Sequence, residues 1–297
     1  MIHTPISPDL PLAEAGRLMM ADELATVHEH LPTLRRTADV TAVHETRKAI
    51  RRTFTLFKLF APYYAPDAFR PYRRGLRRLM RRLAPCRDLA VFQLKLAAYN
   101  ETAEQPLLAL ATDLDTRQRR ADAKLQRYLK RKKPRKFLAR YAAFTQTPGA
   151  GRPRGDEQAA PLLVRHALPA LLFQRVGAVR AYGDVLAEAT PAQFHQLRIQ
   201  FKELRYTLTF FEDILGGRCG EILELTRLMQ VHLGDLNDAN VAVRLLGETT
   251  CCPEEVAVYG GVQETELHRL MAGFRSLYDQ IDRLEVRREL ALALAKL

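Results

Sequence analysis

Two histidines, each followed at fixed spacings by arginine and lysine, are the residues of this chain with the clearest chemical potential. One begins the run HETRKAIRR and the other begins HQLRIQFKELRY. An offset of 151 residues aligns His44 with His195, Arg47 with Arg198 and Arg51 with Lys202. Arginine, lysine and histidine offer N–H donors and positive charge, and one arginine can grip two oxygens at once. The repeated pattern therefore indicates a site for an anion with many oxygen atoms.

Each run forms one face of a predicted α-helix. At 100° per residue, the first face holds His44, Arg47, Lys48 and Arg51 within about 60° of the histidine. The second face holds His195, Arg198, Lys202, Arg205 and Tyr206, opposite a row of Leu and Phe. The alternative is an ordinary amphipathic helix with a solvated basic face. Such faces usually mix signs, because like charges four residues apart repel, and the recurrence favours a binding surface.

Two further basic stripes follow in the first half. One consists of Arg70, Arg74, Arg77, Arg78 and Arg81 on a predicted helix with no acid on that face. The other consists of Arg120, Lys124, Arg127 and Arg131, and it runs into the cluster KRKKPRK at 130–136. A charge run at a helix end is usually solvated. We therefore interpret 130–136 as a solvated helix end and the stripe at 70–81 as part of the anion site.

Two aspartates recur near the histidine helices. Arg87-Asp88 and Asn237-Asp238 are repeated at an offset of 150 residues. Asp88 and Asp238 could accept hydrogen bonds from the arginines and orient them. The run GDLND around Asp238 also resembles a helix start, so a cap or turn role is an equal alternative.

The net charge is concentrated in one part of the chain. The 297 residues carry a formal charge of +12, and residues 35–82 hold 14 Lys or Arg against three acids. This surplus favours a polyanionic partner. The chain lacks a secretory signal and an apolar run of about 20 residues, so we expect a cytoplasmic protein with no membrane insertion.

No motif predicts a metal or a cofactor. The four cysteines at 86, 219, 251 and 252 form no Cys-x-x-Cys pair, and no histidine pair has the spacing of a metal site. We therefore expect free thiols, with no metal site and no cofactor.

Apolar periodicity predicts an all-α fold. We expect helices near 11–34, 40–61, 67–83, 86–101, 104–144, 161–188, 191–215, 219–232, 236–247 and 255–295. Thr190 and Pro191 suit the N-cap and first turn of one of them. A stretch rich in Gly and Pro at 145–160 is the expected linker loop between a half at 11–144 and a half at 161–297.

The motifs resemble a known family. The two histidine runs, with CRDLAVF and LGDLNDANVAV downstream, are similar to the CHAD domain, the conserved histidine α-helical domain, over residues 11–295. The resemblance implies a single domain over 1–297, built from two four-helix bundles that are related by pseudo-twofold symmetry and flank a central basic groove. It also implies binding of inorganic polyphosphate, which sulfate or phosphate would mimic. Residence at polyphosphate granules, among granule-associated proteins, would follow.

The resemblance also assigns residues. His44, Arg47, Lys48, Arg51, His195, Arg198, Lys202 and Arg205 would bind polyphosphate, and the arginines of 70–81 would extend the basic lining. We add Lys124, Arg127 and Tyr206 as further donors on the same stripes. The chain departs from a strict repeat where Asn237 replaces Arg87 and where Phe54 stands for Arg205. It has no room for the triphosphate-processing domain that some relatives carry, so we expect a binder with no catalytic residues.

Nucleic acid is the main rival ligand. Its phosphates would suit the same cations, but proteins that bind single strands usually add aromatic side chains on which bases stack. Tyr206 is the only aromatic residue on the basic face of its helix, and no helix-turn-helix or zinc-finger motif occurs. An enzyme acting on phosphoryl compounds is a third possibility, with less support.

The repeated pattern gives a first prediction. Alanine at Arg47, Arg51, Arg198 and Lys202 together is expected to abolish polyphosphate binding, because it removes the cations shared by both copies. Titration with long-chain polyphosphate measures the loss, and circular dichroism checks the fold. Retained binding would place the site elsewhere.

Overall fold

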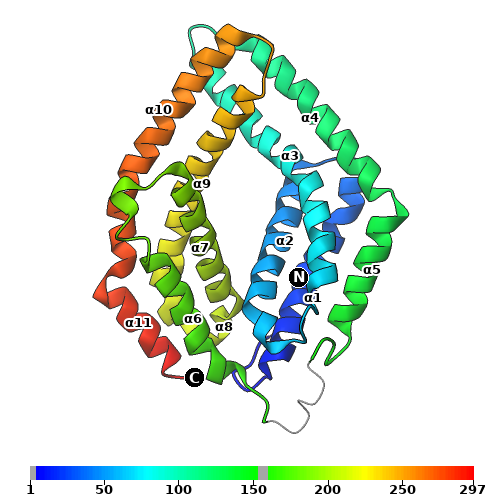
Figure 1. The fold of residues 1–297 in the computed structure, drawn as a ribbon, viewed down its shortest axis with the longest axis vertical. Helices are drawn as coiled ribbons and strands as arrows, with labels where there is room; N and C mark the ends of the chain where they lie inside the picture. The colour runs from blue at the N-terminus through cyan, green and yellow to red at the C-terminus, as the bar shows by residue number, and fades with distance from the viewer. Residues whose placement is uncertain (1–4, 153–159) are drawn as a thin grey trace. The chain divides into compact units, whose positions relative to one another are not determined.

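The computed structural model describes residues 5–152 and 160–297, apart from the side chains of Arg218 and Asp282. It contains eleven α-helices and no strand within those ranges, which confirms the all-α prediction (Figure 1). The chain forms two compact units, Pro11–Pro161 and Pro5–Leu10 with Leu162–Leu297. Residues 153–159 of the expected linker loop lie outside the described residues.

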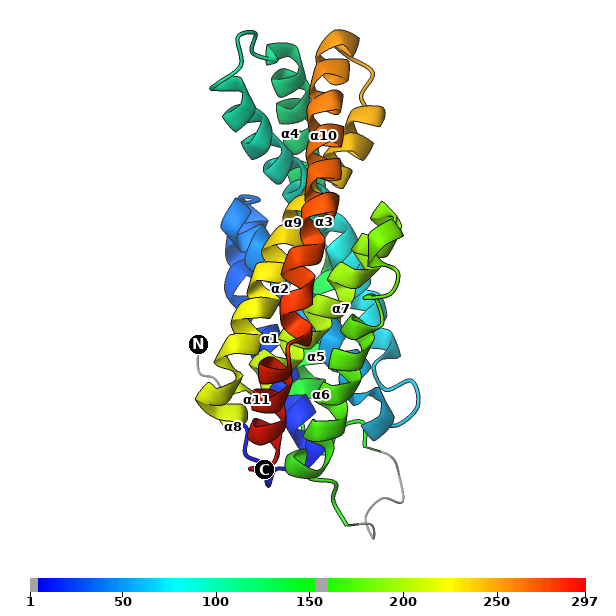
Figure 2. The same cartoon turned by 90° about the vertical axis from the view of Figure 1, so that its left-hand side faces the viewer.

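The first unit contains five helices, with bounds α1 (Leu12–Arg36), α2 (Val40–Phe60), α3 (Arg70–Asn100), α4 (Leu108–Leu129) and α5 (Lys132–Gln146). Each of the first four packs against the next, and α5 packs against α1 and α3. Figure 2 shows the long helices of the chain from the side. Because α2 packs between α1 and α3, one side of it is covered, and His44, Lys48 and Arg51 lie on the other.

The second unit repeats this order of packing. Its helices are α6 (Val164–Arg180), α7 (Pro191–Phe210), α8 (Glu212–Leu215), α9 (Gly220–Gly247), α10 (Pro253–Tyr278) and α11 (Leu284–Leu294). Helix α6 packs on α7, α7 on α9 and α9 on α10. In this order α7 takes the place of α2 and α9 the place of α3, as the repeated motifs predict.

The segment Pro5–Leu10 belongs to the second unit although it precedes the first. The backbone N–H of Val164 donates to the carbonyl of Leu10 at 3.0 Å, and that of Arg165 donates to the carbonyl of Pro8 at 3.0 Å. Asp9 also forms an ion pair with Arg165. Charge and periodicity give no sign of this pairing, since the segment is short and has no repeat partner.

Two predicted breaks are absent from the structure. Helix α3 continues through Pro85, and α9 continues through the predicted start at residue 236. Pro85 is exposed, so its missing N–H costs one hydrogen bond at a solvent-facing position. Buried Leu83 and Cys86 anchor α3 on either side of it. Packing therefore outweighs the local signals that predicted helix ends.

Four predicted helices are shorter or divided. The helix expected at 191–215 divides at Phe211 into α7 and α8. The helix expected at 104–144 ends at Leu129 and restarts at Lys132, with Pro134 in the first turn of α5, where no N–H partner is required. The helix expected at 255–295 divides after Tyr278. The one expected at 161–188 ends at Arg180. Aliphatic periodicity alone does not show these short interruptions.

Aromatic residues fill the covered side of both histidine helices. In the first unit, Phe57 of α2 stacks on Phe69 with ring centroids 4.7 Å apart and meets Tyr141 edge-on at 6.0 Å. In the second unit, Phe194 of α7 meets Phe274 edge-on at 5.6 Å. These buried rings stabilise the helices from one side, which fixes the direction of the opposite, cationic side.

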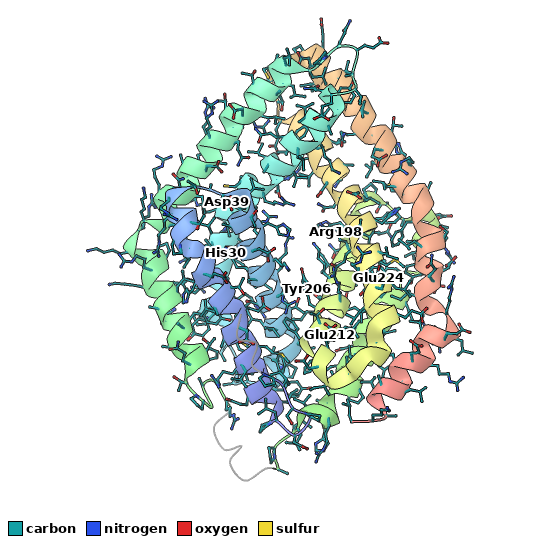
Figure 3. The ribbon with its side chains drawn as sticks, turned by 180° about the vertical axis from the view of Figure 1, so that it is seen from behind. His30, Asp39, Arg198, Tyr206, Glu212 and Glu224 are labelled. Carbon is teal, nitrogen blue, oxygen red and sulfur yellow. The ribbon has the colours of Figure 1, made fainter. Side chains whose placement is uncertain are left out.

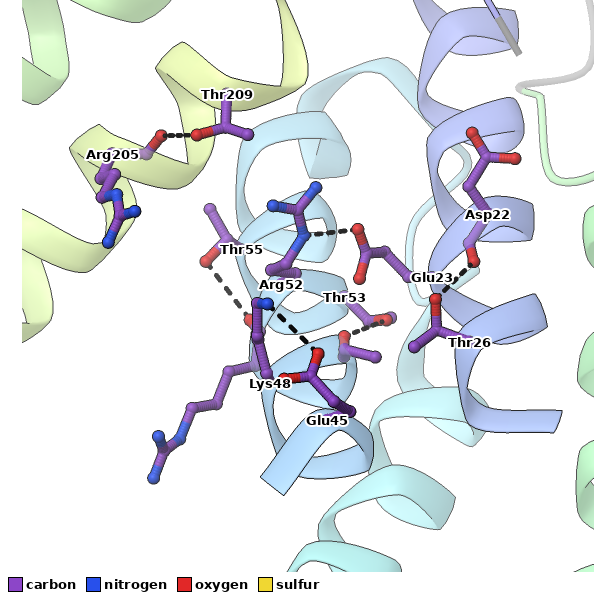
Figure 4. A network of polar contacts seen from close by, with 12 residues as sticks. Asp22, Glu23, Thr26, Glu45, Lys48, Arg52, Thr53, Thr55, Arg205 and Thr209 are labelled. Carbon is purple, nitrogen blue, oxygen red and sulfur yellow. Dashed lines mark hydrogen bonds and ion pairs between the residues drawn. The ribbon is translucent and has the colours of Figure 1, made fainter. Parts of the chain in front are cut away.

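A buried ion pair joins the first two helices of each unit, with its charges exchanged. In the first unit Arg52 of α2 donates to Glu23 of α1 at 2.5 Å (Figure 4). In the second unit Arg175 of α6 donates to Glu203 of α7 at 2.5 Å. The residues occupy equivalent places, because Arg52 and Glu203 lie 151 residues apart and Glu23 and Arg175 lie 152 apart.

The pKa of Glu23 reflects the unfavourable burial of its charged carboxylate. Burial raises the pKa of this carboxyl, and the opposing attraction of Arg52 offsets the rise only in part. A buried pair of this kind adds little net stability, but removal of one partner leaves an uncompensated charge. We therefore expect the pair to influence which helices associate more than it adds to net stability.

The exchanged pairs predict that the polarity can be reversed. Glu23→Ala or Arg52→Ala alone is expected to lower the free energy of unfolding by about 3–5 kcal/mol. Glu23→Arg with Arg52→Glu is expected to recover much of that loss, because the second unit uses this polarity. Denaturant unfolding measures the effect. As a control, exchange of the exposed pair Glu224 and Arg227 should change stability by less than about 1 kcal/mol. A double exchange no more stable than either single variant would contradict the prediction.

Candidate functional site

Helix α2 presents His44 and its cations on an exposed face. Asp39 caps the helix, since its carboxylate accepts a hydrogen bond from the Ala42 N–H at 2.7 Å (Figure 3). His44 and Lys48 are exposed and Arg51 is half-buried. The side chain of Lys48 donates to Glu45 at 3.2 Å, an acid that also lies 3.7 Å from His44.

The surroundings of His44 favour the neutral form of its imidazole. Its pKa is lowered, first by partial loss of solvent around the ring and then by the positive charge of Arg87; Glu45 acts against this shift, and Lys48 and Arg51 add smaller lowering effects. A neutral imidazole can donate one hydrogen bond to a phosphate oxygen. An added negative charge beside it would favour the protonated form.

Arg47 differs from the other cations of the α2 face. It is only 7% exposed, and its guanidinium pairs with the carboxylate of Asp88 on α3 at 3.2 Å. Asp88 lies inside α3, so it does not cap a helix. The pair fixes α2 against α3, and substitution of Arg47 is expected to affect packing as well as charge.

Helix α7 carries the second histidine face. Thr190 and Gln193 form a capping box before it, and Pro191 lies in its first turn, which confirms the predicted start. His195 is exposed, and its Nδ1 lies 3.2 Å from the amide oxygen of Asn237. Arg205 donates to Gln230 of α9 at 2.9 Å.

The remaining predicted residues of α7 lie on the same side. Arg198, Lys202 and Tyr206 are half-buried, and Figure 3 labels Arg198 and Tyr206 along the helix. Asp238 lies inside α9, so it does not begin a helix. It accepts a hydrogen bond from the side chain of Asn237 at 3.3 Å, and its role in orienting an arginine stays a prediction.

The two faces differ in their polar partners. Arg87 adds positive charge near His44, whereas Asn237 at the corresponding place binds His195 through an amide. The first face is therefore cationic on both contributing helices. The second combines cations with neutral donors and acceptors.

The arginines of α3 line two hollows within the first unit. One hollow of about 540 Å³ is lined by Arg70, Arg73, Arg74, Arg77 and Arg81, among others. A second, of about 1100 Å³, includes Arg74, Arg78, Arg81 and Arg82. No residue of α2 lines either hollow. The structure therefore brings the predicted stripe of α3 together as a surface in which His44 has no part.

The basic cluster at 130–136 lies in the larger hollow. Arg131, Lys132, Lys133 and Lys136 line it together with α3, and all four are exposed at the beginning of α5, as expected of a solvated helix end. Only the presence of two basic stripes in the same half could have suggested that α3 and this cluster line one hollow. Lys124 and Arg127 are exposed on α4 and line neither hollow.

Metal-binding clusters and membrane-spanning helices are both absent from the described residues. Among the described residues, no group of three or more His, Cys, Asp or Glu side chains could hold a metal ion. Within the same residues, no helix has the length and apolar character required to cross a bilayer.

These observations define a class of protein: an all-α chain of two helical units, each with a cationic helix that carries a histidine near its start. A family model of the CHAD domain matches residues 18–247, and the chain belongs to the CHAD family. No curated protein matches it in sequence.

Solved structures share the fold. The crystal structure of the CHAD domain from the plant Ricinus communis is 19% identical, with a TM-score of 0.77 over 97% of this chain and 94% of that chain. PptA from Streptomyces chartreusis is 16% identical, with a TM-score of 0.63 over 92% of this chain and 99% of that one. At such low identities the likeness concerns the fold.

Proposed function

We propose that this protein binds inorganic polyphosphate through the cationic faces of α2 and α7. The observation that carries the proposal is the recurrence of one constellation, a histidine with cations one and two turns later, on the exposed side of a helix in each unit. The CHAD family is associated with polyphosphate, which supports the same ligand.

The chemistry of the two faces suits this polymer. Polyphosphate carries about one negative charge per phosphate and has no bases to be read, so a row of donors with little shape selectivity is sufficient. Arginine can bind two phosphate oxygens at once, and lysine adds a mobile point charge. The net charge of +12 strengthens the attraction.

The proposal includes binding without turnover. The two faces offer cations and neutral donors, which hold phosphate, and we assign no nucleophile or general base to them. Association with polyphosphate granules in the cytoplasm, alongside granule-associated proteins, is part of the proposal.

Removal of exposed or half-buried cations from either face tests the proposal. Lys48→Ala with Arg51→Ala, or Lys202→Ala with Arg205→Ala, is expected to weaken binding of long-chain polyphosphate about tenfold or more. The slope of log affinity against log salt should fall by about 1.4, because two fewer counterions are released. Calorimetric titration over a range of salt concentrations measures both effects.

A matched control removes the same charge elsewhere. Arg287 and Arg288 are exposed on α11, and their replacement by alanine should leave affinity nearly unchanged. Equal losses of affinity in all three variants would show that binding depends on net charge alone and on neither face. Release of phosphate during the titration would contradict binding without turnover.

The environment of His44 predicts a pH dependence. Burial and Arg87 lower the pKa of free His44, and a bound polyanion should raise it. Binding then takes up a proton, so affinity should increase as pH falls from about 8 to about 6.

Titrations at fixed ionic strength with His44→Gln measure this contribution. The variant should lose part of the pH dependence, while His268→Gln, at an exposed position on α10, should keep it. A His44→Gln profile identical to that of the unchanged protein would show that His44 does not take up the proton.

A further inference from the structure

The larger hollow of the first unit is a strongly basic surface with aromatic walls. It encloses about 1100 Å³ between α3, the end of α4 and the beginning of α5. Its lining includes nine cations and no acid: Arg74, Arg78, Arg81, Arg82, Arg131, Lys132, Lys133, Lys136 and Arg140. All nine are exposed. Such a concentration of one sign raises the local positive potential and attracts anions.

Two aromatic rings stand among these cations. Tyr128 is half-buried, and the guanidinium carbon of Arg82 lies 5.9 Å from its ring centroid. Burial raises the pKa of Tyr128, although Arg78, Arg82 and Arg81 act against the rise. The tyrosine is thus a neutral ring within reach of three arginines.

The second ring depends on a glycine. Phe137 lies so close to Gly75 of α3 that a Cβ at that position would stand 2.1 Å from the Phe137 ring. The absence of a side chain at Gly75 therefore lets the ring lie against α3. Phe137 stays half-buried and forms part of the wall.

The beginning of α5 adds an independent attraction for anions. This 15-residue helix starts after Arg131 with no side-chain cap and no acid in its first turn. Lys132 and Lys133 stand there, although the positive end of a helix dipole disfavours cations. A phosphate beside these first residues would offset the repulsion and accept hydrogen bonds from free backbone N–H groups.

We propose that this hollow binds single-stranded RNA. A groove of cations that follows the phosphates, together with aromatic faces on which bases stack, is the combination used for single strands. Polyphosphate has no bases and would gain nothing from Tyr128 or Phe137. The nine residues from Arg74 to Arg82 span about 12 Å of helix, which leaves room for a few nucleotides.

The RNA site is separate from the proposed polyphosphate faces. Its lining comes from α3, α4 and α5, with no residue of α2 or α7. Arg74, Arg78 and Arg81, which the family resemblance assigns to polyphosphate, are assigned to RNA by this proposal. The two activities therefore depend on different side chains and can be lost independently.

Binding of a fluorescein-labelled oligouridylate of about 12 nucleotides to the full chain tests the site. Arg78→Ala with Arg131→Ala should weaken binding about tenfold or more and lower the salt slope by about 1.4. Arg287→Ala with Arg288→Ala, which removes the same charge from α11, should leave both unchanged. Equal RNA affinity in the two double variants would overturn the proposal.

Substitutions of Tyr128 separate RNA from polyphosphate. Tyr128→Leu should weaken RNA binding at least fivefold, since stacking of one base contributes about 1–3 kcal/mol, while Tyr128→Phe should bind normally. Neither should change polyphosphate affinity. Normal RNA binding by a folded Tyr128→Leu variant would overturn the proposal.

Polyphosphate titrations of the same variants complete the test. If Arg78→Ala with Arg131→Ala lowers affinity for polyphosphate and not for RNA, the hollow is a polyphosphate site and the RNA proposal fails. Failure of the polyphosphate proposal itself would instead appear as unchanged binding in the α2 and α7 variants. Arg78 and Arg131 are exposed, so their replacement should leave the fold intact. Their double variant therefore tests which ligand the hollow binds even if Tyr128→Leu unfolds.

Discussion

Repulsion among cationic side chains is the constraint that shapes the first half of this protein. Residues 35–82 hold 14 Lys or Arg against three acids, so a compact arrangement must separate these charges or neutralise them. The deeply buried Arg47 pairs with Asp88, and the half-buried Arg52 pairs with Glu23. Most other cations of the stretch lie on the solvent side of α2 and α3, where water or a polyanion offsets them. The covered, aromatic side of α2 keeps this division in place.

The second half keeps the histidine face but has less repulsion among its cationic side chains. Asn237 binds His195 where Arg87 approaches His44, and Gln230 holds Arg205. Amide partners position donors without adding charge, so the α7 face requires less compensation from solvent or ligand. The two halves thus combine one donor pattern with different charge densities. We expect a phosphate polymer to gain most of its electrostatic free energy from the first half.

The sequence was sufficient to predict the features that depend on local residue patterns. Apolar spacing is sufficient for an all-α fold, and Thr190 with Pro191 marks the start of α7. It could not show that Arg47 is covered by α3, because a helical wheel contains no neighbouring helix. It also could not show that Phe137 meets Gly75 or that residues 131–136 face α3, since those contacts join positions about 60 apart. The continuation of α3 through Pro85 likewise depends on packing.

The exchanged ion pairs have a consequence for how a duplicated chain folds. Two halves with similar helices risk misassembly during synthesis, when an early helix can pair with the wrong copy. Pairing of α1 with α7 would bury Glu23 against Glu203, and pairing of α6 with α2 would bury Arg175 against Arg52. Each error would leave like charges in an apolar interface, at a cost of several kcal/mol. The opposite polarities therefore favour pairing of helices within each unit over pairing with the equivalent helix of the other unit.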